Sequence, residues 1–237
     1  ISITTLDGSL QAQVIEIVER HHLRQQYNEI HNAAAIVIEV ESGNVLAYVG
    51  NCGFPFERSH GNEVDIITSP RSTGSLLKPL LYAAMLDDGK FLPASLVPDI
   101  PMNLNGFSPV NFDGHFEGAV PAGKALSRSL NVPAVQMLRT YGVERFHHLI
   151  RSLGMNTIDK TSGHYGLSLI LGGAEGSLEE MTNIYAAFSR ILNHYGSSGL
   201  YYAGDYRPPN YLLPEQRRQE SGSREPGLFN ASSIWYT

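Results

Sequence analysis

Ser75 and Lys78 are the residues whose types and spacing point most directly to chemistry. They lie in Gly74-Ser75-Leu76-Leu77-Lys78-Pro79, directly before the apolar run 80–86. Residues three apart on a helix share a face, so the lysine amine can reach back over the serine hydroxyl. A serine hydroxyl is a weak nucleophile that needs an adjacent base, and the free N–H groups at a helix start favour a developing anion. This spacing indicates a serine acyl-enzyme.

A helix that begins with a capping serine and carries a solvated lysine is the alternative explanation. Three details argue against it. Gly74 permits a tight turn and a close approach to a substrate, Pro79 is tolerated because it falls in the first helical turn, and run 80–86 is too apolar for a surface helix. We therefore expect Ser75 and Lys78 at the start of a buried helix.

Ser129-Leu130-Asn131 is a second candidate motif. It closes a helix expected over 121–130, and the Val132-Pro133 that follows turns the chain. At such a turn a hydroxyl and a carboxamide can both point into a cleft. Serine and asparagine near helix ends often bond only the local backbone, however. Residues 42–44 match the same Ser-x-Asn pattern and fit a hairpin turn better.

Composition narrows the class of protein. A chain of 237 residues with 42% hydrophobic residues can form one large domain or two small ones with a real core. Its net charge of -6 argues against nucleic acid as a partner, because phosphate binding needs clustered lysine and arginine. No run of about 18 apolar residues and no signal peptide is present. The protein is then either cytosolic or separated from an upstream anchor.

No metal or organic cofactor is expected. The single cysteine, Cys52, excludes an intrachain disulfide and makes a cysteine-based metal site implausible. The histidine pairs 21–22 and 147–148 are adjacent in sequence, so on a helix their side chains diverge and neither pair alone chelates one ion well.

Periodicity and turn residues predict a mostly helical chain with a single hairpin. Because a two-stranded sheet is marginal by itself, further strands are expected after Thr237. The expected elements are a connector helix from Asp7 or Ser9 to about 26, strands 33–40 and 45–49, a loop over 51–73, a helix from Ser75 to 88–89, a long irregular segment over 91–120, helices 121–130, 133–141 and 143–153, a helix opened by the capping box at Ser177 and ending near 195, and a loop-like remainder.

Taken together, these motifs resemble the penicillin-binding protein and serine β-lactamase superfamily, whose motif set is Ser-x-x-Lys, Ser-Asp-Asn and Lys-Thr-Gly. The bifunctional class A enzymes are the most similar, and within them the penicillin-binding protein 1C subgroup. The resemblance covers nearly the whole chain, through Ser75-x-x-Lys78, Ser129-x-Asn131, Thr4-Thr5-Leu6-Asp7 with Leu10-Gln11, and segments 93–99, 111–114 and 165–175.

The resemblance implies an α+β transpeptidase fold, a helical subdomain plus an antiparallel sheet, with the C-terminal strands missing here. Residues 1–32 would be a connector helix and 33–237 the transpeptidase domain, incomplete at its C-terminus. Ser75 would be the nucleophile, Lys78 its base and Ser129 a proton relay, and Asn131 would hold the substrate amide and the lysine ammonium.

The implied reaction cross-links peptidoglycan. The donor would be a stem peptide ending in D-Ala-D-Ala, the acceptor an amine of a neighbouring stem, and β-lactam antibiotics would acylate the same serine. The implied location is the extracytoplasmic face of the bacterial inner membrane, with an anchor and a glycosyltransferase domain upstream of this sequence. Alternatives are a D,D-carboxypeptidase or β-lactamase-like hydrolase, and a non-catalytic module that only recognises penicillin or stem peptides.

One departure from the family pattern matters. No Lys-Thr-Gly or Lys-Ser-Gly triplet follows the 165–175 segment, and Lys160-Thr161-Ser162-Gly163 carries an extra residue on the wrong side of it, so we interpret it as a loop. In the family the strand after that triplet supplies one of two oxyanion donors. We therefore expect this chain by itself to react poorly with a β-lactam.

Overall fold

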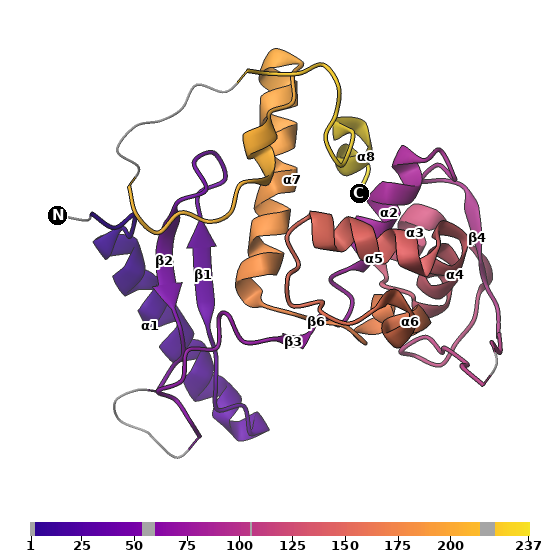
Figure 1. Ribbon diagram of the computed structural model, residues 1–237. Helices are drawn as coiled ribbons and strands as arrows, with labels where there is room; N and C mark the ends of the chain where they lie inside the picture. The colour runs from indigo at the N-terminus through magenta and orange to yellow at the C-terminus, as the bar shows by residue number, and fades with distance from the viewer. Residues whose placement is uncertain (1–2, 54–59, 105, 214–220) are drawn as a thin grey trace. The chain divides into compact units, whose positions relative to one another are not determined.

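The computed structural model describes residues 3–53, 60–104, 106–213 and 221–237 (Figure 1). Its contacts divide the chain into two compact units, each made of two separate stretches of sequence. Unit 1 comprises Ile1–Pro70 and Ser177–Arg224, and unit 2 comprises Arg71–Gly176 and Glu225–Thr237. The domain boundary expected after residue 32 stays a prediction.

Unit 1 is built around an antiparallel hairpin of β1 (Ala35–Ile38) and β2 (Val45–Val49), which confirms the predicted hairpin. Helix α1 (Gly8–Gln25) packs against it and is followed by a 3-10 turn, Gln26–Asn28. The N-terminus of α1 is capped by Asp7, as expected, because its carboxylate accepts a hydrogen bond from Leu10 N–H at 2.8 Å. The core of this helix and hairpin contains Val14, Val18, Ala47, Val49 and Cys52.

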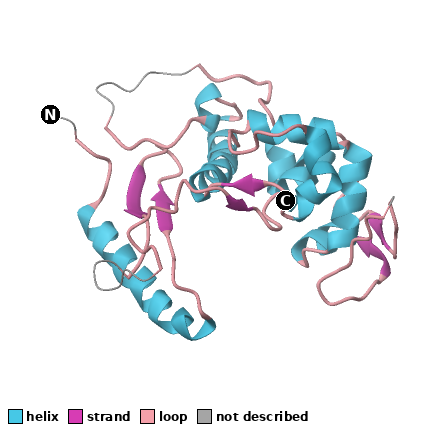
Figure 2. Ribbon diagram, turned by 60° about the horizontal axis from the view of Figure 1, so that its bottom comes forward, coloured by secondary structure: helices cyan, strands magenta, loops and turns pink. Residues whose placement is uncertain are grey.

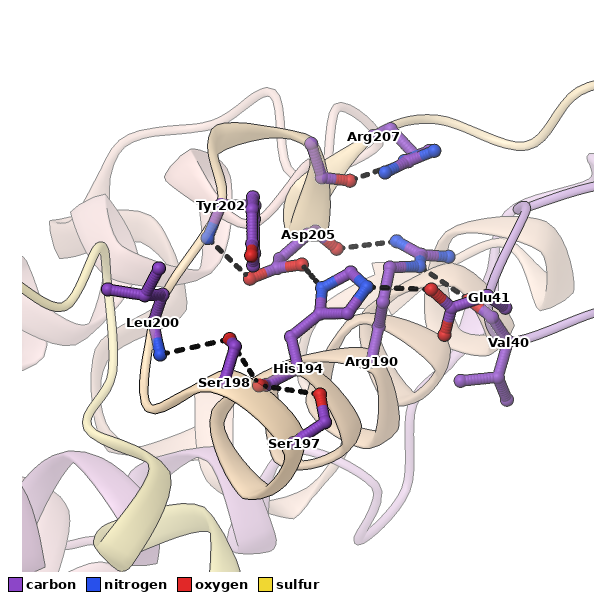
Figure 3. Close-up of polar contacts among 11 residues, drawn as sticks. Val40, Glu41, Arg190, His194, Ser197, Ser198, Leu200, Tyr202, Asp205 and Arg207 are labelled. Carbon is purple, nitrogen blue, oxygen red and sulfur yellow. Dashed lines mark hydrogen bonds and ion pairs between the residues drawn. The ribbon is translucent and has the colours of Figure 1, made fainter. Parts of the chain in front are cut away.

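Helix α7 (Leu178–Ser198) contacts β1 within unit 1. It opens with the predicted capping box, in which Ser177 and Glu180 each bond the other's backbone N–H. Near its C-terminal end, His194 lies between two carboxylates (Figure 3): Nδ1 is 2.6 Å from Asp205 in the 3-10 turn η3 (Ala203–Tyr206), and Nε2 is 2.7 Å from Glu41. These contacts tie α7 to both neighbouring segments.

Unit 2 is mainly helical (Figure 2). Its central helix, α2 (Lys78–Asp87), buries the six residues of run 80–85 together with Lys78, and it contacts α3, α4 and α8. The sequence predicted four of these helices approximately. It missed the short α8 in the apolar tail and the short α6, which begins at Ser162 within the expected loop 160–163. The helical segments of unit 2 are α2 (Lys78–Asp87), α3 (Ala122–Ser127), α4 (Asn131–Tyr141), α5 (Val143–Ser152), α6 (Ser162–Tyr165), the 3-10 turn η2 (Gly166–Leu171) and α8 (Ala231–Trp235).

The prediction of a single hairpin was wrong, because unit 2 holds two more small antiparallel sheets. Strand β3 (Arg71–Ser72) pairs with β6 (Glu175–Gly176), and β4 (Leu96–Asp99) pairs with β5 (Gly118–Pro121). Pro98 within β4 and the long intervening segment concealed the second pair, since strand signals are read locally. The segment 91–120, which was expected to be irregular, therefore contains a pair of antiparallel strands near its two ends.

No helix in the described parts of the chain combines the length and apolarity needed to cross a bilayer. In unit 2, helices α2, α3 and α4 flank two turns, 74–77 and 128–130, that carry candidate site residues.

Candidate active site

Ser75 lies in the turn before α2, not within the helix, because α2 begins at Lys78. The backbone N–H of Leu76 donates to Thr73 O at 3.0 Å, and that of Lys78 donates to Ser75 O at 3.1 Å. Such i to i+3 bonds tighten the chain just before the regular helix starts. Ser75 is exposed, and within the described residues its hydroxyl has no hydrogen-bond partner.

Lys78 is buried, with only 4% of its surface exposed, and its ammonium is held by polar neighbours. Nζ donates to the backbone oxygen of Ser129 at 2.6 Å, to the Ser129 hydroxyl at 3.2 Å and to Asn131 Oδ1 at 2.7 Å. An apolar cavity lined in part by Leu81, Leu130 and Met137 adjoins the lysine. Burial lowers the pKa of Lys78 to about 8, because desolvation disfavours the charged amine.

Ser129 turns the chain between two helices. The predicted helix over 121–130 was too long: α3 ends at Ser127, and Ser129 adopts a left-handed backbone conformation with φ of 54°. This conformation is uncommon for a residue with a side chain. Here both the carbonyl and the hydroxyl of Ser129 face the amine of Lys78. The left-handed turn thus lets Ser129 present both its carbonyl oxygen and its hydroxyl oxygen to the amine of Lys78.

Asn131, the first residue of α4, is half-buried with its side-chain amide fixed on both sides. Oδ1 accepts from Lys78, and Nδ2 donates to Val110 O at 2.9 Å. An amide nitrogen carries two hydrogens, so one N–H of Asn131 is left for another acceptor.

The structure therefore brings three of the four sequence-predicted residues into one hydrogen-bonded cluster, Lys78 with Ser129 and Asn131. Ser75 lies one turn before the lysine, and the lysine amine bonds to the Ser129 turn in place of the Ser75 hydroxyl. Hydrogen bonds between catalytic groups often form only when substrate is bound. The roles of all four residues stay predictions.

The turn that carries Ser75 is held by hydrogen bonds to a distant segment, 172–174. Thr73 N–H donates to Ala174 O at 3.1 Å, and the Ser72 hydroxyl donates to Gly172 O at 2.8 Å. Gly172 has φ of 90°, and a Cβ there would lie 2.9 Å from the backbone nitrogen of Gly74. Only glycine fits this approach. The Gly-Gly pair at 172–173 was the sequence signal that two backbones meet.

Asn111 is another residue whose place the sequence did not reveal. It lies in the loop before β5, yet its side-chain oxygen accepts from the backbone N–H of Asn131 at 2.9 Å.

No cluster of three or more histidine, cysteine, aspartate or glutamate side chains suited to a metal ion occurs among residues 3–53, 60–104, 106–213 and 221–237. The cluster around Lys78 offers an amine, a hydroxyl and an amide, which are groups for proton transfer and amide binding.

Solved structures that share this α+β fold include penicillin-binding proteins. A transpeptidase domain of penicillin-binding protein 3 from Burkholderia pseudomallei superimposes with a TM-score of 0.72 over 98% of this chain and 67% of that chain, at 18% identity. PonA1 from Mycobacterium tuberculosis superimposes with a TM-score of 0.71 over 99% of this chain and 61% of that chain, at 17% identity. At such low identity these similarities establish the fold alone.

Sequence comparison defines the family. Residues 33–192 match the family model of the penicillin binding protein transpeptidase domain. Penicillin-binding protein 1C of Escherichia coli is 39% identical over 79% of this chain, and penicillin-binding protein 1F of Bacillus subtilis is 30% identical over 97%. The chain belongs to the penicillin-binding protein transpeptidase family. It spans 24% and 30% of the lengths of these two relatives.

Proposed function

We propose that this chain forms part of a peptidoglycan D,D-transpeptidase that works through an acyl-enzyme on Ser75. Family membership supports the reaction class. The observation that carries the proposal is the buried Lys78, whose pKa is lowered to about 8, held by Ser129 and Asn131 one turn after an exposed serine. A lysine with a pKa near neutrality can act as a general base.

In the proposed reaction the Ser75 oxygen attacks the carbonyl carbon between the last two D-alanines of a stem peptide. The serine proton passes to the neutral amine of Lys78. When the peptide C–N bond breaks, the resulting ammonium returns a proton through the Ser129 hydroxyl to the departing D-alanine amine. An amine of a neighbouring stem then attacks the ester carbonyl, the ester C–O bond breaks, and the proton lost by the amine passes through Lys78 to the Ser75 oxygen. Asn131 orients Lys78 and donates its remaining N–H to the substrate amide.

The proposal extends to partners and location. Stem peptides would be donor and acceptor, and β-lactams would react as mimics of the donor. The intact protein would act at the extracytoplasmic face of the inner membrane, with an anchor and a glycosyltransferase domain preceding this sequence. Within the 237 residues the missing Lys-Thr-Gly or Lys-Ser-Gly triplet leaves one oxyanion donor unassigned.

Substitution of Ser75 in the intact natural protein tests the nucleophile. Ser75→Ala should abolish labelling by fluorescent penicillin, because no other hydroxyl is placed one turn before Lys78 in the described chain. Ser108→Ala is the matched control, since Ser108 is also an exposed serine of unit 2. Peptide mapping that located the adduct on another residue would reject the assignment.

The lifetime of the adduct separates the alternative functions. A transpeptidase forms a long-lived penicilloyl ester and transfers the donor peptide to an added amine. Rapid hydrolysis of the ester by water would indicate a β-lactamase-like enzyme, and hydrolysis of the donor peptide without transfer would indicate a carboxypeptidase. Binding of stem peptide or penicillin without any covalent adduct would indicate a recognition module.

A further inference from the structure

The start of α4 is capped by a side chain that lies twenty residues earlier in the sequence. The first N–H groups of a helix lack partners within it. Leu130, which precedes α4, has no side chain that can accept them. Asn111 Oδ1 does so instead, accepting from the N–H groups of Asn131 at 2.9 Å and Val132 at 3.2 Å.

The orientation of the Asn111 amide is fixed by a buried carboxylate. Asn111 is 2% exposed, and its Nδ2 donates to Asp99 Oδ1 at 2.7 Å and to His115 O at 2.8 Å. Asp99 is fully buried, and its other oxygen accepts from Glu117 N–H at 2.9 Å. Because both amide hydrogens are committed, only the oxygen of Asn111 can face α4.

Val110 and Asn111 hold Asn131 at two points. The carbonyl of Val110 accepts from the side-chain Nδ2 of Asn131 at 2.9 Å, while Asn111 accepts from its backbone N–H. The remaining polar atom of the Asn131 side chain accepts from Lys78 Nζ at 2.7 Å. The 110–111 dipeptide therefore determines where Asn131 presents its oxygen to the lysine.

We infer that Asn111, oriented by Asp99, is a positioning residue for the reaction: it fixes Asn131 and, through Asn131, the amine of Lys78. The inference rests on the proposed function, in which Lys78 takes the proton of Ser75. Neither Asn111 nor Asp99 contacts the reacting atoms. Their contribution is geometric, and displacement of catalytic groups by about 1 Å can cost on the order of 10²-fold in rate.

Asn111→Ala in the intact protein tests this role. The rate of acylation by fluorescent penicillin should fall by about 10²-fold. The rising limb of its pH profile should also move to lower pH, because Lys78 loses a well-placed acceptor that favours its charged form. Asn103→Ala is the matched control: Asn103 lies in the same segment and accepts from Gly106 N–H at 2.9 Å, but is exposed. A merely destabilised enzyme would lose rate without a shifted profile.

Exchanging the residue types at positions 99 and 111 gives a second test of the positioning role, which can be used if Asn111→Ala does not fold. Asn111→Asp alone sets two carboxylates against each other in a buried place and should be slow. Combining it with Asp99→Asn restores one donor facing one acceptor at this pair and leaves an oxygen toward α4, but the His115 carbonyl loses its donor. The double variant should therefore recover part of the acylation rate that Asn111→Asp loses, and be faster than that single variant.

Two results overturn the inference. One is a folded Asn111→Ala protein with the wild-type acylation rate and pH profile, and the other is a double variant no faster than Asn111→Asp. If the unmodified protein is acylated at Ser75 in either case, only the positioning role fails. If the unmodified protein gives no adduct on Ser75, the proposed function fails and this inference with it.

Discussion

Lys78 is a residue whose protonation the fold changes strongly, because its amine is buried. Since burial lowers its pKa to about 8, roughly a tenth of the molecules carry the neutral amine at pH 7. We expect the rate of acylation by penicillin to rise with pH and level off above about 8. Lys78→Arg should react slowly at every pH, because an arginine does not deprotonate. A flat profile between pH 6 and 9 would contradict the role of Lys78 as base.

Ser129 contributes a hydroxyl group to the Lys78 cluster, and its backbone conformation is unfavourable for a residue with a side chain. Its φ of 54° is one that glycine adopts freely and alanine does not. Ser129→Gly and Ser129→Ala both remove the hydroxyl and should both slow acylation. The glycine variant should be more stable than the alanine variant by about 1 kcal/mol. Denaturant unfolding of the two proteins measures this difference, and equal stabilities would show that the left-handed turn relaxes when the hydroxyl is removed.

Among the structural elements, the pairing of β3 with β6 depends on close backbone contact beside the turn that carries Ser75. A Cβ on Gly172 would lie 2.9 Å from the backbone of Gly74 and 2.5 Å from Ser72 Oγ. We expect Gly172→Ala to lower the free energy of unfolding by about 2 kcal/mol and to slow acylation by displacing Ser75. Gly163→Ala serves as the control, because nothing lies within 4 Å of a Cβ at that helical position.

Helix α7 is joined to its neighbours by an ionisable contact (Figure 3). Burial by itself would lower the pKa of His194, but hydrogen bonds to Glu41 and Asp205 outweigh it and raise the pKa. A raised pKa in the folded state means that this stabilisation is complete below pH 6.5 and is lost as pH rises through the folded-state pKa.

His194→Gln should remove that pH dependence from the stability of the protein. We expect the difference in unfolding free energy between wild type and variant to be largest near pH 5.5 and to shrink toward pH 9. Thermal or denaturant unfolding at a series of pH values measures it. A difference that stays constant across this range would contradict a charged His194.

At the scale of the whole molecule, the sequence contains the serine, lysine and Ser-x-Asn groups but no Lys-Thr-Gly or Lys-Ser-Gly triplet. If the strand after that triplet supplies an oxyanion donor, the 237-residue chain should be acylated about 10²–10³ times more slowly than the intact protein. Parallel labelling of both with fluorescent penicillin checks this. Equal rates would show that both oxyanion donors lie within these residues.

The sequence by itself determined the features that depend on neighbours along the chain. The cap at Asp7, the capping box at Ser177 and the β1–β2 hairpin were predicted correctly because each is formed by residues close in sequence. The spacing of Ser75 and Lys78 is local in the same sense, and the family resemblance followed from such short motifs.

Only the tertiary structure decided what surrounds those motifs. The three acceptors of Lys78 belong to Ser129 and Asn131, more than fifty residues away, and the cap on α4 comes from Asn111. The β4–β5 pairing and the left-handed turn at Ser129 were likewise missed. The long-range contacts depend on where packing of the core brings distant backbone segments together, which neither periodicity nor turn propensity encodes. The turn at Ser129 has no signal in residue type, because serine rarely adopts a positive φ.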